Sequence, residues 1–157
     1  MRSIGTHVYA LLLSLWVGGI FLFTFIVTPV IFRSYTRDIA GEIVGKLFPS
    51  YFIFSLAVSA VTLIVFLLSF PDRNAKVYLP SVVLLIAAVV ISLYVSVRLH
   101  PEIRKVKQEI ASFEATAPND LLRKKFRSLH AQSAVLNLIM LADGVALLIM
   151  SAGMKKY

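Results

Sequence analysis

The chain has 157 residues, of which 59% are hydrophobic and 15% are charged, and its mean hydropathy is +0.84. These values lie far outside the range of soluble domains, so the sequence predicts a membrane protein with little room for a separate soluble domain. The absence of cysteine excludes disulfides, thiolate metal sites, c-type haem attachment and cysteine nucleophiles. The net charge of +8 lies mostly beside apolar runs, where topology and anionic lipid explain it better than nucleic acid does.

Four apolar runs are long enough to cross the roughly 30 Å hydrocarbon core of a bilayer as helices. They cover residues 8–32, 51–70, 77–97 and 131–152. The first run is much longer than the apolar part of a secretory signal peptide, so we interpret it as a mature helix. The polar sequence PDRNAK joins the second and third runs as a short turn between antiparallel helices. We therefore expect an all-α, four-helix integral membrane bundle that forms a single transmembrane domain over residues 1–157.

The basic residues indicate an orientation for this bundle. An even number of spans places both termini on one side of the membrane, together with the turn after Phe70. Eleven of the 16 Lys and Arg residues lie on the opposite side, in the two longer loops and beside them. The positive-inside rule therefore predicts that the long loops are cytoplasmic and that both termini are external.

Both longer loops carry helical patterns. In TRDIAGEIVGKLF, Ile39, Ile43 and Leu47 recur every four residues, which predicts a short amphipathic helix lying on the bilayer surface. After His100, apolar residues recur at helical spacing through PEIRKVKQEIASF, and TAPND then breaks the chain before the fourth run. We expect the third and fourth helices to project into the cytoplasm as a helical hairpin whose two members pack only on each other.

Three stretches resemble the transmembrane-protein-205-like family, a group of small four-span membrane proteins without a settled activity. They are THVYALLLSLWVGGIFLFTFIVTPVIF, AGEIVGKLFPSYF and FRSLHAQSAVLNL. The second is the most specific, and its matching positions are Lys46, Leu47, Phe48, Pro49, Tyr51 and Phe52. In the third, the family's pattern falls on His130, Ser133 and Asn137. The resemblance implies an integral membrane protein associated with resistance to metal-containing compounds, without a defined mechanism. The first span is also similar to copper-resistance protein D and to HemJ-type protoporphyrinogen oxidase.

The first span carries a stripe of polar, small and aromatic residues. Four of them fall within about 20° of one direction on a helix, namely His7, Ser14, Gly18 and Phe25. We expect this stripe to face other helices of the protein, where Gly18 and Gly19 allow close approach. Trp16 lies on the opposite side, and Pro29 is expected to relax the last turn.

On the fourth span, His130, Ser133 and Asn137 share one face. The resemblance suggests that this polar ladder joins helices, because Asn137 can bond to a hydroxyl or carbonyl of a neighbour for about 1 kcal/mol. A binding role for His130 is the alternative.

Asp143 lies about 140° around the same helix from His130, so it belongs to a separate face. Met150 and Met154 share its direction within about 20°, towards the external end where His7 is also expected. A charge at the centre of a bilayer costs about 3 kcal/mol or more unless it is paired, protonated or hydrated. Three interpretations stay open: a protonated carboxyl bonded between helices, a proton or cation pathway, and a ligand site open to the external side.

Metal or haem binding is a further hypothesis, with His7, His100 and His130 as candidate ligands. His7 is expected across the bilayer from the other two, so it cannot share an iron with either. His100 and His130 can meet if the third and fourth helices are neighbours, and His7 can combine with Met150 or Met154 around copper or haem b. The structural interpretation treats all three histidines as interfacial anchors.

No Gly-rich phosphate loop, HExxH motif, paired intramembrane carboxylates or nucleophile elbow occurs in the sequence, so an enzymatic activity has no support. The leading prediction is a non-enzymatic membrane accessory protein or subunit, as a homo-oligomer or in a larger complex, that binds a small ligand near Asp143 or the external His7 and Met150. The alternatives are a haem b or copper-binding redox or metal-handling protein, and a small transporter of cations or metal compounds.

Overall fold

The computed structural model describes residues 2–70 and 76–154, with side chains for 4–70 and 76–152. The expected turn over residues 71–75, the side chain of Met154, and Lys155 and Lys156 lie outside the described residues. The elements are α1 (Arg2–Leu22), η1 (Phe23–Val27), α2 (Thr28–Ser34), α3 (Arg37–Ser69), α4 (Tyr78–Tyr94), η2 (Val95–Leu99), α5 (His100–Glu109) and α6 (Leu121–Met154). All regular structure in these ranges is helical.

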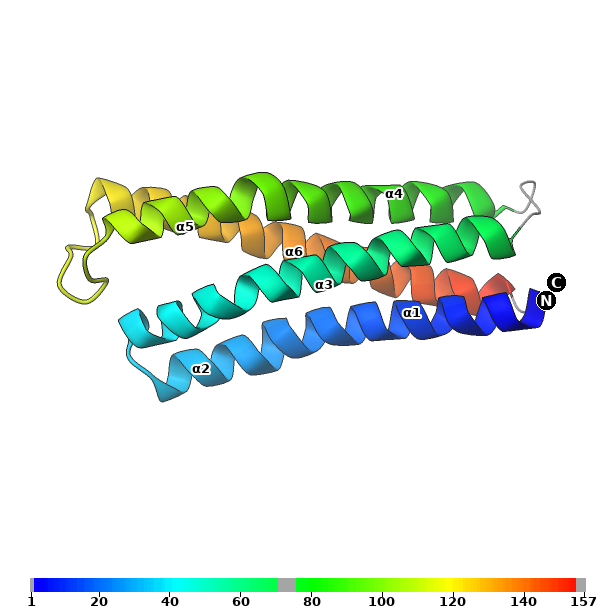
Figure 1. Ribbon diagram of the computed structural model, residues 1–157, viewed down its shortest axis with the longest axis horizontal. Helices are drawn as coiled ribbons and strands as arrows, with labels where there is room; N and C mark the ends of the chain where they lie inside the picture. The colour runs from blue at the N-terminus through cyan, green and yellow to red at the C-terminus, as the bar shows by residue number, and fades with distance from the viewer. Residues whose placement is uncertain (1, 71–75, 155–157) are drawn as a thin grey trace.

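Four long helical rods form an elongated bundle (Figure 1). They run over Ile4–Ser34, Arg37–Ser69, Tyr78–Glu109 and Leu121–Ala152, and each is long and apolar enough to cross a membrane. The expected fold class, an all-α bundle with four long apolar helices, is thereby confirmed. α1 begins and α6 ends at one end of the bundle, which we call the terminal end, and the opposite end is the loop end (Figure 1). Because about 20 residues suffice to cross a bilayer, these rods of 31 to 33 residues extend beyond its apolar layer.

Two short π-helical segments interrupt the rods at corresponding places. In η1 the backbone N–H of Thr28 bonds to the carbonyl of Phe23, five residues back, and η2 is closed in the same way. Each segment comes directly before a proline-bearing helix start, at Pro29 and Pro101. A proline has no N–H, and its ring clashes with the carbonyl four residues back, so a widened turn accommodates it. The relaxation expected near Pro29 therefore takes the form of η1.

The expected surface helix is not a separate element. Residues 37–48 form the first part of α3, which continues without a break to Ser69 and contains Pro49 in its interior. A break here would leave several backbone groups without partners beside the bilayer, whereas Pro49 removes only one helical hydrogen bond, so the continuous helix is favoured.

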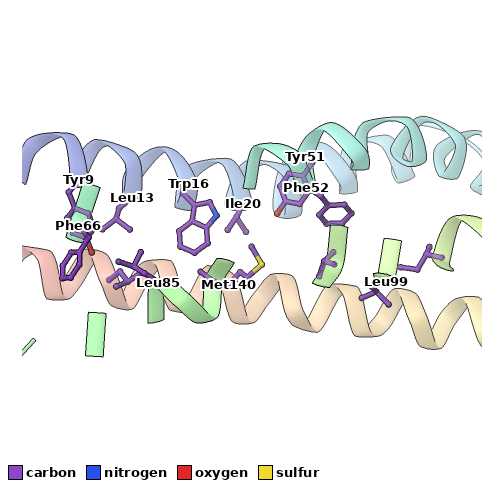
Figure 2. Close-up of a cluster of buried hydrophobic side chains, with 14 residues drawn as sticks. Tyr9, Leu13, Trp16, Ile20, Tyr51, Phe52, Phe66, Leu85, Leu99 and Met140 are labelled. Atoms are coloured by element: carbon purple, nitrogen blue, oxygen red, sulfur yellow. The ribbon is translucent and has the colours of Figure 1, made fainter. Parts of the chain in front are cut away.

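The core lies on a face of α1 that the sequence did not indicate. Tyr9, Leu13, Trp16 and Ile20 point from α1 into the bundle and are fully buried (Figure 2). Trp16 also donates from Nε1 to Ser55 Oγ of α3, at 3.0 Å. The expected inward stripe of His7, Ser14, Gly18 and Phe25 is instead exposed, so that expectation was wrong. The apolar area of four large side chains and the indole hydrogen bond decide the rotation of α1, because burying them is worth more than burying small residues.

Two glycines show how closely α1 and α6 are packed. A Cβ atom at Gly144 of α6 would lie 2.6 Å from Val17 Cγ2 and 3.3 Å from the Trp16 ring, whereas a Cβ at Gly18 would meet nothing within 4 Å. Close approach of α1 and α6 therefore depends on Gly144. Gly19, expected to permit close approach together with Gly18, faces Phe54.

We expect Gly144→Ala to be less stable than Gly18→Ala, because both gain helix propensity but only the first overpacks the core. Overpacking of this kind costs about 1–3 kcal/mol. The midpoints of thermal unfolding of the two variants in detergent micelles measure the difference. Equal midpoints would show that α1 and α6 are not in close contact at this position.

A basic cleft at the loop end as candidate functional site

A cleft of about 670 Å³ lies at the loop end, and residues of α2, α3, α5 and α6 line it. Two hairpin tips lie at this end of the bundle: α2 and the start of α3 make one, and α5 and the start of α6 make the other (Figure 1). Each tip packs within itself, and the cleft lies between the two. We call it the basic cleft, after the six Lys and Arg residues in its lining: Arg37, Lys46, Arg104, Lys107, Arg123 and Arg127.

The lining of the basic cleft combines positive charge with aromatic and apolar surface. Its apolar members are Phe32, Val44, Phe48, Pro49, Ile103, Phe113 and Phe126. Among the described residues that line it, Glu42 is the single acidic side chain. A cavity of this kind offers both an anion site and an apolar wall.

Hydrogen bonds join the two hairpin tips at the rim of the cleft. Asp38 of α3 accepts from the Ser112 hydroxyl at 2.6 Å and from the backbone N–H of Phe113 at 2.7 Å. Lys107 of α5 donates through Nζ to the carbonyl oxygen of Gly41. The hairpin of α5 and α6 was expected to pack only on itself, and these contacts with α3 show that this was wrong.

The basic side chains differ in how far their charge is compensated. Lys46 pairs with Glu42 at 2.7 Å, and both side chains are exposed, so this pair contributes little to stability. Arg123 donates to the carbonyl of Thr116, which leaves its positive charge in place. Within the described part of the chain, the guanidinium groups of Arg37 and Arg104 have no hydrogen-bond or ion-pair partner. The cleft therefore carries an excess of uncompensated positive charge.

Aromatic rings and two histidines form the inner end of the cleft. Phe48 and Phe52 stack with their centroids 5.3 Å apart, and both meet His100 edge-on, at 5.9 and 5.2 Å. His130 stacks on Phe126 at 5.8 Å. Both histidines line the same cleft, so the structure brings them together, while His7 lies towards the terminal end.

The described residues contain no group of three or more His, Cys, Asp or Glu side chains arranged to hold a metal ion. Among the candidate ligands whose side chains are described, His100 and His130 line one cavity.

A hydrogen-bonded triad lies on the core side of the cleft. The Tyr51 hydroxyl donates to Asn137 Oδ1, and Asn137 Nδ2 donates to Thr24 Oγ1 at 2.6 Å. These three side chains, which we call the polar triad, connect α3, α6 and η1. Ser133 is buried one turn away and lines a small cavity of about 10 Å³ together with Tyr51 and Asn137.

The stretch AGEIVGKLFPSYF, singled out by resemblance, forms much of this region. Lys46, Phe48 and Pro49 line the cleft, while Tyr51 and Phe52 are buried beneath it. Leu47 is exposed on the other side of α3. The six positions thus separate into a cleft-lining part, a core part and one outward-facing residue.

Asp143 lies far from the cleft, in the core of the bundle. It is 8% exposed, and neither carboxylate oxygen has a hydrogen-bond partner among the described residues. Met150, which shares its helix face, is partly buried, and His7 is exposed. A shared ligand site of Asp143, His7, Met150 and Met154 stays a prediction.

Sequence reasoning assigned most of the cleft's basic residues to topology and missed their role as a lining. A signal for them exists within α6, where Arg123, Phe126, Arg127 and His130 follow the three- and four-residue spacing of one helix face. Arg37 gives a weaker signal, because the residues that follow it at this spacing on α3, namely Gly41, Val44 and Phe48, are uncharged.

The fold and the cleft define a multi-pass, four-helix membrane protein with an amphipathic cavity at one end of its bundle. A family model described as Domain of unknown function (DUF4149) matches residues 11–112, and the chain belongs to this family. The matched part runs from α1 through α5 and includes the cleft-lining stretch of α3. No curated protein matches the chain, and no solved structure matches it. The resemblance to the transmembrane-protein-205-like family stays a prediction.

Replacing Asn137 tests the contribution of the polar triad. Asn137→Leu removes two cross-helix hydrogen bonds, so we expect the free energy of unfolding to fall by about 1–2 kcal/mol. Tyr51→Phe should cost less, and should add almost nothing when Asn137 is already Leu, because the two residues act through one bond. Unfolding in mixed micelles measures these values.

Ser14→Ala is the matched control, since the Ser14 hydroxyl bonds to the Ala10 carbonyl of its own helix and is exposed. A loss at Ser14 as large as that at Asn137, or fully additive losses at Tyr51 and Asn137, would contradict a stabilising triad.

Proposed function

We propose that this protein binds an anionic amphiphile from the bilayer, with the anionic headgroup in the basic cleft and the apolar chains against its aromatic wall. The observation that carries this proposal is the composition of the cleft: about 670 Å³ lined by six Lys and Arg residues, one acidic residue and several aromatic rings. Cavities of this size accommodate ligands of several hundred daltons. A phosphate-bearing lipid is the ligand class that matches both halves of the lining.

The chemistry of the basic side chains favours a phosphate headgroup. The guanidinium group of arginine is planar and binds two phosphate oxygens at once, and the guanidinium groups of Arg37 and Arg104 lie in the lining without a partner among the described residues. Phosphate binding thus accounts for the predominance of arginine in the cleft.

The position of the cleft also favours a lipid. It lies where the helices extend past their apolar runs, at the level of lipid headgroups. The predicted orientation places this end on the cytoplasmic side, whose leaflet is rich in anionic lipids in many membranes. A lipid can therefore enter from the bilayer without crossing water.

The role we propose is still that of a non-enzymatic ligand-binding membrane protein, as predicted from the sequence. The ligand site is now placed at the loop end instead of the terminal end. The cleft combines volume, positive charge and an apolar wall. The site predicted at the terminal end has two described side chains beside Asp143, the exposed His7 and the partly buried Met150. That the protein is a subunit of a larger complex, or forms a homo-oligomer, stays a prediction.

Lipid binding can be measured on the full chain by native mass spectrometry and by the shift of its unfolding midpoint. The probes are phosphatidylglycerol, phosphatidylcholine and inorganic phosphate, added to protein in a neutral detergent. We expect phosphatidylglycerol to bind and to raise the midpoint with concentration, as a ligand of the folded state does. Phosphatidylcholine and inorganic phosphate should each bind at least about tenfold more weakly.

Two double variants that each remove two positive charges distinguish lipid binding in the cleft from attraction of the lipid by surface charge. Arg37→Gln with Arg104→Gln removes two cleft charges, and Arg33→Gln with Lys105→Gln removes two charges from adjacent positions that do not line the cleft. We expect the first pair to weaken phosphatidylglycerol binding by about tenfold or more, as the loss of charge-assisted hydrogen bonds does. The second pair should change it little.

Equal losses in both pairs would show that the lipid binds by surface charge alone, and the proposal would then be wrong. Inorganic phosphate binding as tightly as phosphatidylglycerol would replace the amphiphile with a soluble anion. If phosphatidylglycerol bound no more tightly than phosphatidylcholine, the cleft would not select an anionic headgroup, and that part of the proposal would be wrong.

A further inference from the structure

Lys107 extends across the basic cleft from α5 to α3. Its Nζ donates to the carbonyl oxygen of Gly41. A Cβ atom at Gly41 would lie 3.5 Å from this Nζ, and a Cβ at Gly45 would lie 3.3 Å from it. The ammonium group thus lies against α3 at two glycines, which leave room for it. Lys107 therefore marks the place where α3 and α5 meet across the cleft.

Arg37 and Arg104 lie on opposite sides of this contact. α3 begins at the loop end, whereas α5 runs towards it (Figure 1). Arg37 is four residues before Gly41 on α3, so it lies about one helical turn, or about 5 Å, from the contact towards the loop end. Arg104 is three residues before Lys107 on α5, so it lies about one turn from the contact towards the terminal end. All three basic residues line the cleft, and we call Arg37, Lys107 and Arg104 the cation row.

The protein does not pair the charges of the cation row. Within the described part of the chain, no member of the row forms an ion pair. The carbonyl oxygen that accepts from Lys107 is neutral. Two carboxylates lie on this part of α3, but Asp38 is hydrogen-bonded to the other hairpin tip and Glu42 pairs with Lys46. A single phosphodiester brings one negative charge, so it would leave most of the row uncompensated.

We propose that the lipid in the basic cleft carries two phosphate groups, one between Arg37 and Lys107 and the other between Lys107 and Arg104. This inference rests on the proposed function and specifies its ligand class. Lys107 contacts both phosphates, because an ammonium group has three N–H donors and Gly41 accepts from one of them. The phosphates are joined directly, as in a lipid diphosphate, or through glycerol, as in cardiolipin. Basic pockets between membrane helices bind headgroups of this kind.

Native mass spectrometry of the full chain in a neutral detergent tests the number of phosphates. The probes are cardiolipin, geranylgeranyl diphosphate and phosphatidylglycerol. We expect cardiolipin or geranylgeranyl diphosphate to bind about tenfold more tightly than phosphatidylglycerol, because a second phosphate adds charge-assisted hydrogen bonds. The tighter of these two ligands identifies how the phosphates are joined.

Lys107→Gln tests whether the cation row causes this preference. The substitution removes the cation that contacts both phosphates, so the preference over phosphatidylglycerol should fall to about twofold or less. Lys105→Gln is the matched control, since Lys105 lies on α5 and does not line the cleft. The preference should be unchanged in this variant.

The failure of this inference differs from the failure of the proposed function. If phosphatidylglycerol bound as tightly as both two-phosphate lipids, the second phosphate would be wrong and the proposed function would stand. If none of the three lipids bound, the proposed function would be wrong as well. A preference that persists in Lys107→Gln, or that Lys105→Gln reduces equally, would overturn the cation row. The wild-type comparison decides the number of phosphates even if Lys107→Gln does not fold.

Discussion

The architecture depends on the hydrogen bonds of Asn137, because they join three of the four rods at one level. Tyr51 from α3 and Thr24 from η1 both bond to this residue of α6. Polar side chains at membrane depth must find partners inside the protein, so the triad fixes which faces of these rods meet. Between the triad and the terminal end, the helices share one apolar core. Between the triad and the loop end, the two hairpin tips diverge. The triad is thus the base of the basic cleft.

The divergence beyond the triad has its own cause in the chain. Pro29 and Pro101 each follow a π-helical segment, and a widened turn changes the direction in which the next helix presents its side chains. Asp38 and Lys107 then join the tips again at the rim. Because contacts bound the basic cleft at its base and at its rim, the cleft keeps its shape. Its basic side chains can then lie beside aromatic rings without moving onto an acidic partner.

Hydropathy was sufficient for the four spans and the all-α bundle, because only helices satisfy the backbone along such long apolar runs. Hydropathy was insufficient to predict which face of α1 packs inward, because α1 is apolar on every side. The sequence therefore could not show that Trp16, and not Gly18, faces the bundle. The cleft required the tertiary structure, since Arg37, Arg104 and Arg127 come from three helices. Lys46, Phe48 and Pro49 were found through a family resemblance, and their spacing alone gives no reason to choose them.

We propose that the basic cleft holds the headgroup of an anionic lipid. A structure of the protein determined in bilayer nanodiscs that contain phosphatidylglycerol tests it most directly. We expect density for one lipid whose phosphate lies between Arg37 and Arg104, with its chains along Phe48 and Phe126. Closed hairpin tips, or a cleft that holds only water while ordered lipid lies on the outer surface of the helices, would contradict it.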